Sequence, residues 1–200
     1  SAFGTGVILL SLAVGSILAS GAGGALGAKR GPVFVVQLGI FLELLGVVGI
    51  ALIISPTTKV ILIIIPLFIY GLGVGLATAQ LTGVALIQIL VEKSGQASGM
   101  TSTTRQIGSA LGIAILGTVL FASFGSNLRD AVPDQRLSSA IVNSAGGAIE
   151  ALSRDPKNNY IVEQSKEALT QGSRTSAYVA SAFLLIGWFA TRSLSRKESR

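Results

Sequence analysis

Long apolar runs with almost no charged side chains dominate this sequence. Residues 4–27 carry no charge, and residues 33–54 carry only Glu43. The hydrocarbon core of a bilayer is about 30 Å thick, and an α-helix of about 20 apolar residues spans it. Because lipid cannot satisfy backbone polar groups, such runs cross a membrane as helices. The pattern predicts an all-α, polytopic membrane helix bundle.

The composition and the placement of charge agree with a membrane protein. Of all residues 50% are hydrophobic, only 12% are charged, and the mean hydropathy is +0.71. The net charge of +6 comes from short basic clusters beside the apolar runs, such as Lys29-Arg30 and the residues after Thr191. Clusters in this position match anionic lipid headgroups. Membrane lipids are therefore predicted partners, and nucleic acid is not.

The sequence contains no cysteine and no histidine. This excludes disulfides, thiol chemistry, zinc sites of the usual kind and acid–base catalysis by histidine. The spans show no nucleophile–base pair, no metal-ligand cluster and no lysine-bearing phosphate loop. Gly71, Gly73 and Gly75 miss the spacing of a dinucleotide-binding turn. No cofactor is expected, and the chain is not expected to be an enzyme.

Turn residues between the apolar runs define the predicted topology. Four transmembrane helices are expected within residues 1–122 and a fifth near the C-terminus. Their expected bounds are about 4–27, 33–54, 60–91, 97–122 and 173–191. The third run is longer than a bilayer requires, so we expect a tilt, a kink near Pro66 or an extension beyond the bilayer.

The segment before the last span differs sharply from the rest. Residues 123–172 are rich in charge and in Asn, Asp and Pro. They are predicted to form an extracytoplasmic, water-exposed loop with short helices near 134–152 and 159–171. Residues 192–200 are predicted to form a cytoplasmic basic tail.

The positive-inside rule gives the predicted orientation. Basic residues are densest at Lys29-Arg30, Lys93 and the C-terminal tail, which share one face when the spans alternate. That density favours this face as cytoplasmic, although the raw count of basic residues on the two faces is a tie. Trp188 and Phe189, close to Arg192, are expected to anchor the last span at the interface.

Glu43 is the strongest pointer to chemistry. It lies near the middle of the second run, where an ionised carboxylate is unfavourable and is often functional. Gly39 and Gly46, one turn away on either side, share its helix face and indicate contact with protein or a cavity. Two interpretations stay open: a proton-coupling or cation site, and a hydrogen-bonded glutamic acid at a helix contact.

Two polar residues lie on one face of the third run. Tyr70 and Gln80 are joined by steps of three and four residues, so they are candidate cavity or substrate residues. The alternative is that both form hydrogen bonds between helices. Gly71 and Gly75 have the spacing of a helix-packing motif.

Residues 94–120 form an apolar stretch that carries an arginine. One helical stripe of this stretch holds its small and polar residues: Ser98, Thr101, Ser102, Arg105, Gly108, Ser109 and Gly112. Such a stripe is typical of a helix that packs against other helices in a membrane. Arg105 either extends to the headgroups or is buried and pairs with a carboxylate or carbonyls.

This stretch also carries a family resemblance. Residues 95–119, GQASGMTSTTRQIGSALGIAILGTV, resemble the penultimate helix of fourteen-span drug:proton antiporters of the major facilitator superfamily. The pattern there is roughly G-x-A-S-G-x-x-N-T-x-R-Q-x-G-x-A-L-G. The residues that match its distinctive positions are Gly99, Arg105, Gln106, Gly108 and Gly112. The resemblance covers residues 1–122 and 173–191, as the last five spans.

The sequence departs from the family pattern at several positions. Ser102 stands where the family usually has asparagine, and Ala28 stands where its loop motif commonly has aspartate. Ala79-Gln80 occupies the place of a common Pro-Pro pair. Residues 123–172 match no part of the pattern.

The resemblance implies a function and a location. It implies the C-terminal part of a secondary active transporter in a bacterial plasma membrane, with both termini cytoplasmic. The expected activity is proton-coupled efflux of amphipathic or cationic small molecules by alternating access. The expected partners are the small-molecule substrate and N-terminal spans of the same protein that precede Ser1. The alternative is a non-transporting membrane module that assembles with or regulates a partner protein.

Overall fold

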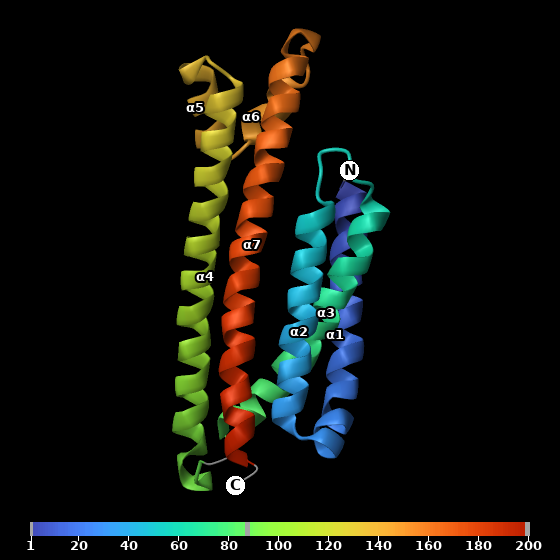
Figure 1. The fold of residues 1–200 in the computed structure, drawn as a ribbon, viewed down its shortest axis with the longest axis vertical. Helices are drawn as coiled ribbons and strands as arrows, with labels where there is room; N and C mark the ends of the chain where they lie inside the picture. The colour runs from blue at the N-terminus through green and yellow to red at the C-terminus, as the bar shows by residue number, and fades with distance from the viewer. Residues whose placement is uncertain (1, 87–88, 199–200) are drawn as a thin grey trace.

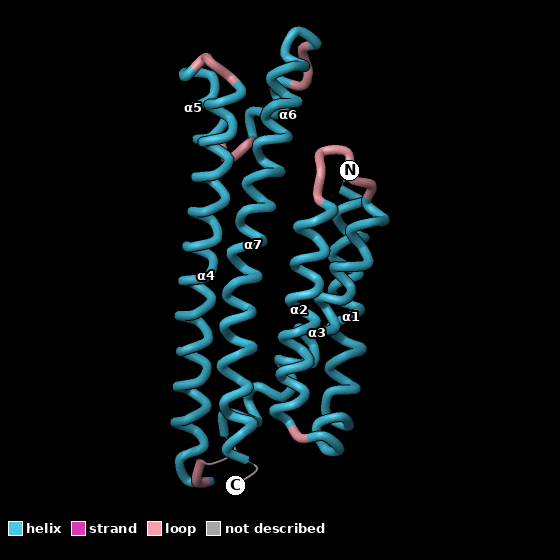
Figure 2. Tube along the Cα trace, viewed as in Figure 1, coloured by secondary structure: helices cyan, strands magenta, loops and turns pink. Residues whose placement is uncertain are grey.

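The computed structural model describes residues 2–86 and 89–198. The long helices are α1 (Ala2–Arg30), α2 (Pro32–Ile53), α3 (Val60–Leu86), α4 (Ser94–Ala131) and α7 (Asn159–Glu198). The short ones are α5 (Gln135–Asn143) and α6 (Gly147–Leu152), with single 3₁₀ turns at Val91–Lys93 and Pro156–Asn158. No strand occurs among the described residues (Figure 2), which confirms the predicted all-α fold.

The long helices form two groups (Figure 1). In the first group α3 packs against both α1 and α2, and in the second α4 packs against α7. Contacts between α2 and α7 join the groups. Small residues let α3 approach its neighbours closely. A Cβ at Gly75 would collide with the Ser16 carbonyl of α1, and one at Gly73 would lie 2.5 Å from the Gly39 carbonyl oxygen of α2.

The turn between α1 and α2 has the residues that a sharp reversal needs. Gly31 has φ 87°, a conformation that side chains other than glycine rarely adopt, and Pro32 begins α2. The two helices therefore run antiparallel with almost no connecting chain.

Among the residues that the structure describes, four helices are long and apolar enough to cross a membrane: α1 from Gly4, α2, α3 as far as Leu81, and α4. The chain is therefore an integral membrane protein, as the apolar runs predict. The described part of α7 is not among these four, so the fifth span at 173–191 stays a prediction. In the third helix the chain continues through Pro66 as one helix that ends at Leu86.

The structure corrects the boundaries around residues 123–172. Helix α4 does not end near residue 122 but continues to Ala131, and α7 already begins at Asn159. With 38 residues, α4 is about 57 Å long, far more than a hydrocarbon core of about 30 Å. Part of α4 therefore projects beyond the bilayer, and α7 packs against α4. The predicted short helix at 159–171 is the first part of α7.

The projecting end has a hydrophobic core of its own, which we call the distal core. Its buried residues come from α4 and its C-cap and from α5, α6 and α7: Phe124, Leu128, Val132, Ile141, Ile149, Val162 and Ala168. The predicted helix near 134–152 is two helices, because Ala145 and Gly146 have φ of 52° and 84°. Asp134 begins the first of them by accepting from the backbone N–H groups of Arg136 and Leu137.

Hydrogen bonds fasten α7 to its two neighbours. Gln37 Nε2 donates to the Thr191 carbonyl at 3.1 Å, and Arg174 Nη2 donates to the Ile54 carbonyl, just beyond α2, at 2.7 Å. Ser176 Oγ donates to the Leu116 carbonyl of α4 at 2.9 Å. The cation of Arg174 lies at the C-terminal end of α2, where a helix dipole favours positive charge. These bonds hold α7 against both α2 and α4.

Candidate functional site

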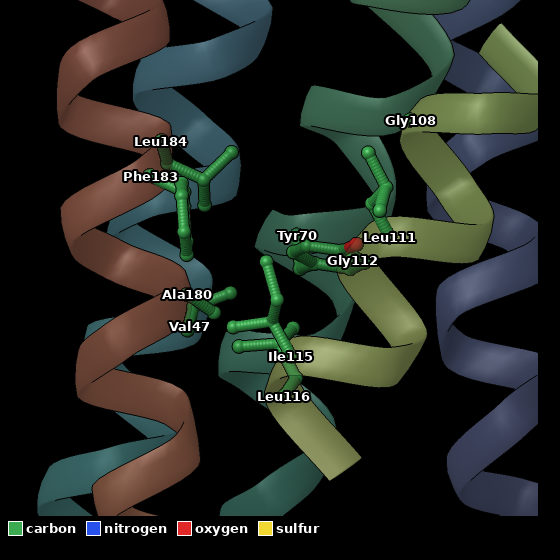
Figure 3. A pocket seen from close by; sticks show the side chains of 10 residues that line it. All are labelled: Val47, Tyr70, Gly108, Leu111, Gly112, Ile115, Leu116, Ala180, Phe183 and Leu184. Carbon is green, nitrogen blue, oxygen red and sulfur yellow. The ribbon is translucent and has the colours of Figure 1, made fainter. Parts of the chain in front are cut away.

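A cavity of about 470 Å³ lies between the two helix groups (Figure 3). Four helices contribute to its wall: α2, α3, α4 and α7. The lining residues are Val47, Tyr70, Gly108, Leu111, Gly112, Ile115, Leu116, Ala180, Phe183 and Leu184. All of these side chains are apolar except for the hydroxyl of Tyr70. Ligand pockets commonly have volumes of about 300–1,000 Å³ and mostly apolar walls, and this cavity has both properties.

Glycines on α4 leave part of this space open. A Cβ at Gly108 or Gly112 would meet no other atom within 4 Å, and the same holds for Gly99. Along this stripe α4 is largely exposed, and residues 102–110 all have exposed side chains or backbone. The packing of the stripe against other helices stays a prediction.

Glu43 lies at the contact between α2 and α3, beside the cavity. It is half-buried, and its Cγ would lie 2.8 Å from a Cβ at Gly73. Val47, one turn further along α2, lines the cavity. The carboxyl lies close enough to Tyr70 to interact with it electrostatically. The structure thus brings Glu43 and Tyr70 together at the cavity's edge.

Gln80 lies elsewhere and does not line the cavity. Its Nε2 donates to the Gly23 carbonyl of α1 at 3.0 Å, and its amide fills the space that Gly27 leaves open. A role of Gln80 at a substrate cavity of the whole protein stays a prediction. Within the described chain Gln80 forms a hydrogen bond between helices, the other role that its sequence position allowed.

Replacing Gln80 with leucine is expected to lower the free energy of unfolding by about 0.6–1.7 kcal/mol, the range for interhelical hydrogen bonds in membranes. The Gly23 carbonyl loses the amide donor, while the cavity keeps its lining. Unfolding in mixed micelles measures the change, with the exposed Gln106→Leu as the matched control. Equal losses in the two variants would contradict this role for Gln80.

Arg105 is exposed and lies at a second cavity of about 470 Å³. Thr101, Thr104 and Met100 of α4 line the same space, together with residues from α3 and the connection that follows it. Gln106 is also exposed. Neither Arg105 nor Gln106 is among the residues that line the first cavity.

Sequence reasoning missed most of the first cavity's wall. Phe183 and Leu184 of α7, and Leu111 and Ile115 of α4, are ordinary apolar residues of apolar helices. In a helix of this kind, lipid-facing and cavity-facing positions have the same composition, so no sequence signal marks them. Gly108 and Gly112 could have indicated the cavity from the sequence, because glycines have no side chain to fill the space beside the helix. Within the part of the chain that the structure describes, no three acidic, His or Cys residues gather to hold a metal ion.

The fold and the cavity define an integral membrane protein whose helices line an apolar cavity that is open to the surroundings of the bundle. Comparison with known proteins shows that the chain is similar in sequence to several bacterial proteins. The chain is 32% identical to multidrug resistance protein Stp of Mycobacterium tuberculosis over 92% of its own length. It is 33% identical to a probable actinorhodin transporter of Streptomyces coelicolor over 39% of its length. It is 29% identical to the multidrug resistance protein B homolog of Mycobacterium tuberculosis over 60% of its length.

The chain therefore spans only part of these relatives. The matched region covers 37%, 14% and 22% of their respective lengths. Their names are those of transporters and resistance proteins rather than of enzymes. Because the relatives are bacterial and the helices are apolar, the predicted location in a bacterial plasma membrane is confirmed. No family model matches the chain. No solved structure matches it significantly.

Proposed function

We propose that this chain is part of a secondary active transporter that exports amphipathic or cationic small molecules by proton-coupled alternating access. The observation that supports this most strongly is the similarity to multidrug resistance protein Stp over 92% of the chain. We assign the whole protein to the fourteen-span drug:proton antiporters of the major facilitator superfamily, with this chain as its C-terminal part. The Arg105-Gln106 segment carries that assignment.

In this proposal the residues that line the cavity between the helix groups form one wall of the substrate path. Its apolar lining suits the hydrophobic part of an amphipathic compound, and the ring of Tyr70 offers an aromatic face to a cation. Gly108 and Gly112 open this wall towards further helices of the same protein, which complete the path. The end of the bundle with Arg30 and Arg192 faces the cytoplasm, and the distal core lies outside the cell.

Glu43 is the proposed proton site. Its half-buried position between α2 and α3 makes its protonation state matter to the contact between these helices. Gly73 and Gly46 bring the two helices so close that a charge there has few ways to be solvated. A proton that binds and leaves at Glu43 would therefore bias the packing of α3 beside the cavity. This links proton movement to the shape of the substrate path.

The test is efflux of a fluorescent cationic dye from vesicles that contain the full-length protein and an imposed proton gradient. Glu43→Gln is expected to reduce gradient-driven efflux to the level of empty vesicles, because the amide cannot release a proton. Glu43→Asp is expected to retain part of the activity. Glu92→Gln, a change at an exposed acid in the turn before α4, is the control and is expected to leave efflux unchanged.

Two results count against the proposal in different ways. Efflux by Glu43→Gln with an unchanged dependence on the proton gradient would remove Glu43 from coupling. A full-length wild-type protein that moves no compound across the vesicle membrane would instead favour the alternative, a membrane module that acts through a partner protein.

A further inference from the structure

A further concave surface lies between α2 and α7. It lies towards the end of the bundle where α2 begins and where the C-terminus lies (Figure 1). It is a groove of about 240 Å³ lined by Phe34, Gln37, Leu38, Phe41 and Trp188. Phe34 and Phe41 are 40% and 41% exposed, so the groove is open to the surroundings of the bundle. It shares no residue with the cavity at Tyr70 and has no part in the proposed transport path.

Two arginines flank this groove, each held over an aromatic ring. The guanidinium of Arg30 lies 5.7 Å from the ring centroid of Phe34, and that of Arg192 lies 4.9 Å from the ring centroid of Trp188. These distances are those of cation–π contacts. The ring centroids of Phe41 and Trp188 lie 6.3 Å apart and continue the aromatic wall along the groove. The groove is therefore amphipathic, with cations at its mouth and aromatic rings along its length.

The geometry of this groove is fixed by the fold. Gln37 Nε2 donates to the Thr191 carbonyl at 3.1 Å and so holds α2 against α7 beside Arg192. Neither residues 28–42 nor residues 173–192 contain an aspartate or a glutamate. The chain that forms the groove supplies no acid to neutralise its two cations.

We propose that this groove is a binding site for an anionic phospholipid, with the phosphate between Arg30 and Arg192 and an acyl chain along Phe34, Phe41 and Trp188. Charge complementarity selects the anionic headgroup, because each basic residue near a membrane surface contributes to the attraction of anionic lipid. The aromatic wall selects a lipid over a free anion, since only a lipid has an apolar chain to place there. Aromatic residues beside basic ones are the usual arrangement at a membrane interface. The bound lipid bridges α2 and α7 and thereby stabilises the contact between the two helix groups.

The experiment uses the purified full-length protein in lipid nanodiscs of phosphatidylcholine with or without phosphatidylglycerol. Trp188 is the single tryptophan of these 200 residues, so its fluorescence reports on the groove once any tryptophan elsewhere in the protein is replaced by phenylalanine. Brominated phosphatidylglycerol is expected to quench Trp188 at lower mole fractions than brominated phosphatidylcholine does. Arg30→Gln and Arg192→Gln are each expected to weaken this preference about fivefold, and the double variant is expected to abolish it.

Lys59→Gln is the matched control, because Lys59 is an exposed cation in the turn at the other end of α2. It is expected to leave the preference unchanged. The comparison of the two brominated lipids within each variant removes the direct effect of Arg192 on Trp188 emission. Circular dichroism and gel filtration confirm that each variant remains folded.

Three outcomes would overturn the proposal. Equal quenching of the wild type by the two brominated lipids would show that the groove does not select anionic headgroups. Loss of the preference on adding inorganic phosphate would indicate a site for a free anion. Absence of quenching by either lipid would show that another helix, rather than lipid, covers the groove.

Discussion

Phe124→Ala is expected to destabilise the distal core by about 3–5 kcal/mol, the usual effect of removing a buried phenylalanine. Phe124 is fully buried, with 0% of its surface exposed. It lies where α4 meets α7, and a Cβ at Gly172 of α7 would lie 3.3 Å from its Cβ. The space left by its ring cannot close easily, because α4 and α7 are rigid helices that continue into the bundle.

Hydrogen exchange measures this effect without unfolding the membrane-embedded helices. The amides of α5 and α6 are expected to exchange about 100- to 4,000-fold faster in Phe124→Ala, because these short helices depend on the distal core. The matched control is Phe121→Ala, three residues earlier on α4, where the ring is 40% exposed. Exchange that rises equally in both variants would contradict a core centred on Phe124.

The sequence predicts the bundle well because one physical effect decides it: in lipid, backbone polar groups must form hydrogen bonds within the chain. Residues 4–27 and 33–54 have no stable alternative in lipid to a helix, and Gly31-Pro32 allows only a sharp turn between them. The observed α1 and α2 follow these runs closely. Whether a segment forms a transmembrane helix depends on its local composition, and this can be read from a single sequence.

The distal end is predicted less well because its structure depends on contacts between distant segments. Residues 159–171 look like a separate amphipathic helix, but Gly172 lets α7 pass close to α4 and continue without a break. Ala145 lies in the turn between α5 and α6 with a φ of 52°, a conformation that alanine rarely adopts. The distal core imposes both features, and periodicity in one segment cannot reveal them.

For the candidate site, too, the sequence predicts one part and not another. Tyr70 and Gln80 share a helix face, yet ten residues along α3 separate them by about 15 Å. At Tyr70 that face meets the open side of α4, while at Gln80 it meets the Gly23 carbonyl of α1. Sequence spacing assigns residues to a face, and only the position of the neighbouring helices decides whether that face has a cavity beside it.

The cavity itself leads to the second large expected effect. Gly112→Phe is expected to reduce efflux of bulky substrates by the full-length protein about 10- to 200-fold, the range that one misfitting methylene group produces in a hydrophobic pocket. A Cβ at Gly112 would meet no other atom within 4 Å, so a side chain can enter the cavity without displacing the helix. The added ring would take up the space beside Tyr70 that a substrate needs.

Gly117→Phe is the control that separates cavity filling from damage to α4. A Cβ added at Gly117 would also meet no atom within 4 Å, but Gly117 is not part of the cavity wall. Both variants are expected to show wild-type unfolding in mixed micelles, and only Gly112→Phe is expected to lose dye efflux. Because both changes replace glycine with the same residue in the same helix, they alter helix propensity equally. Unchanged efflux in Gly112→Phe would place the substrate path elsewhere, and equal losses in both variants would attribute the effect to α4 as a whole.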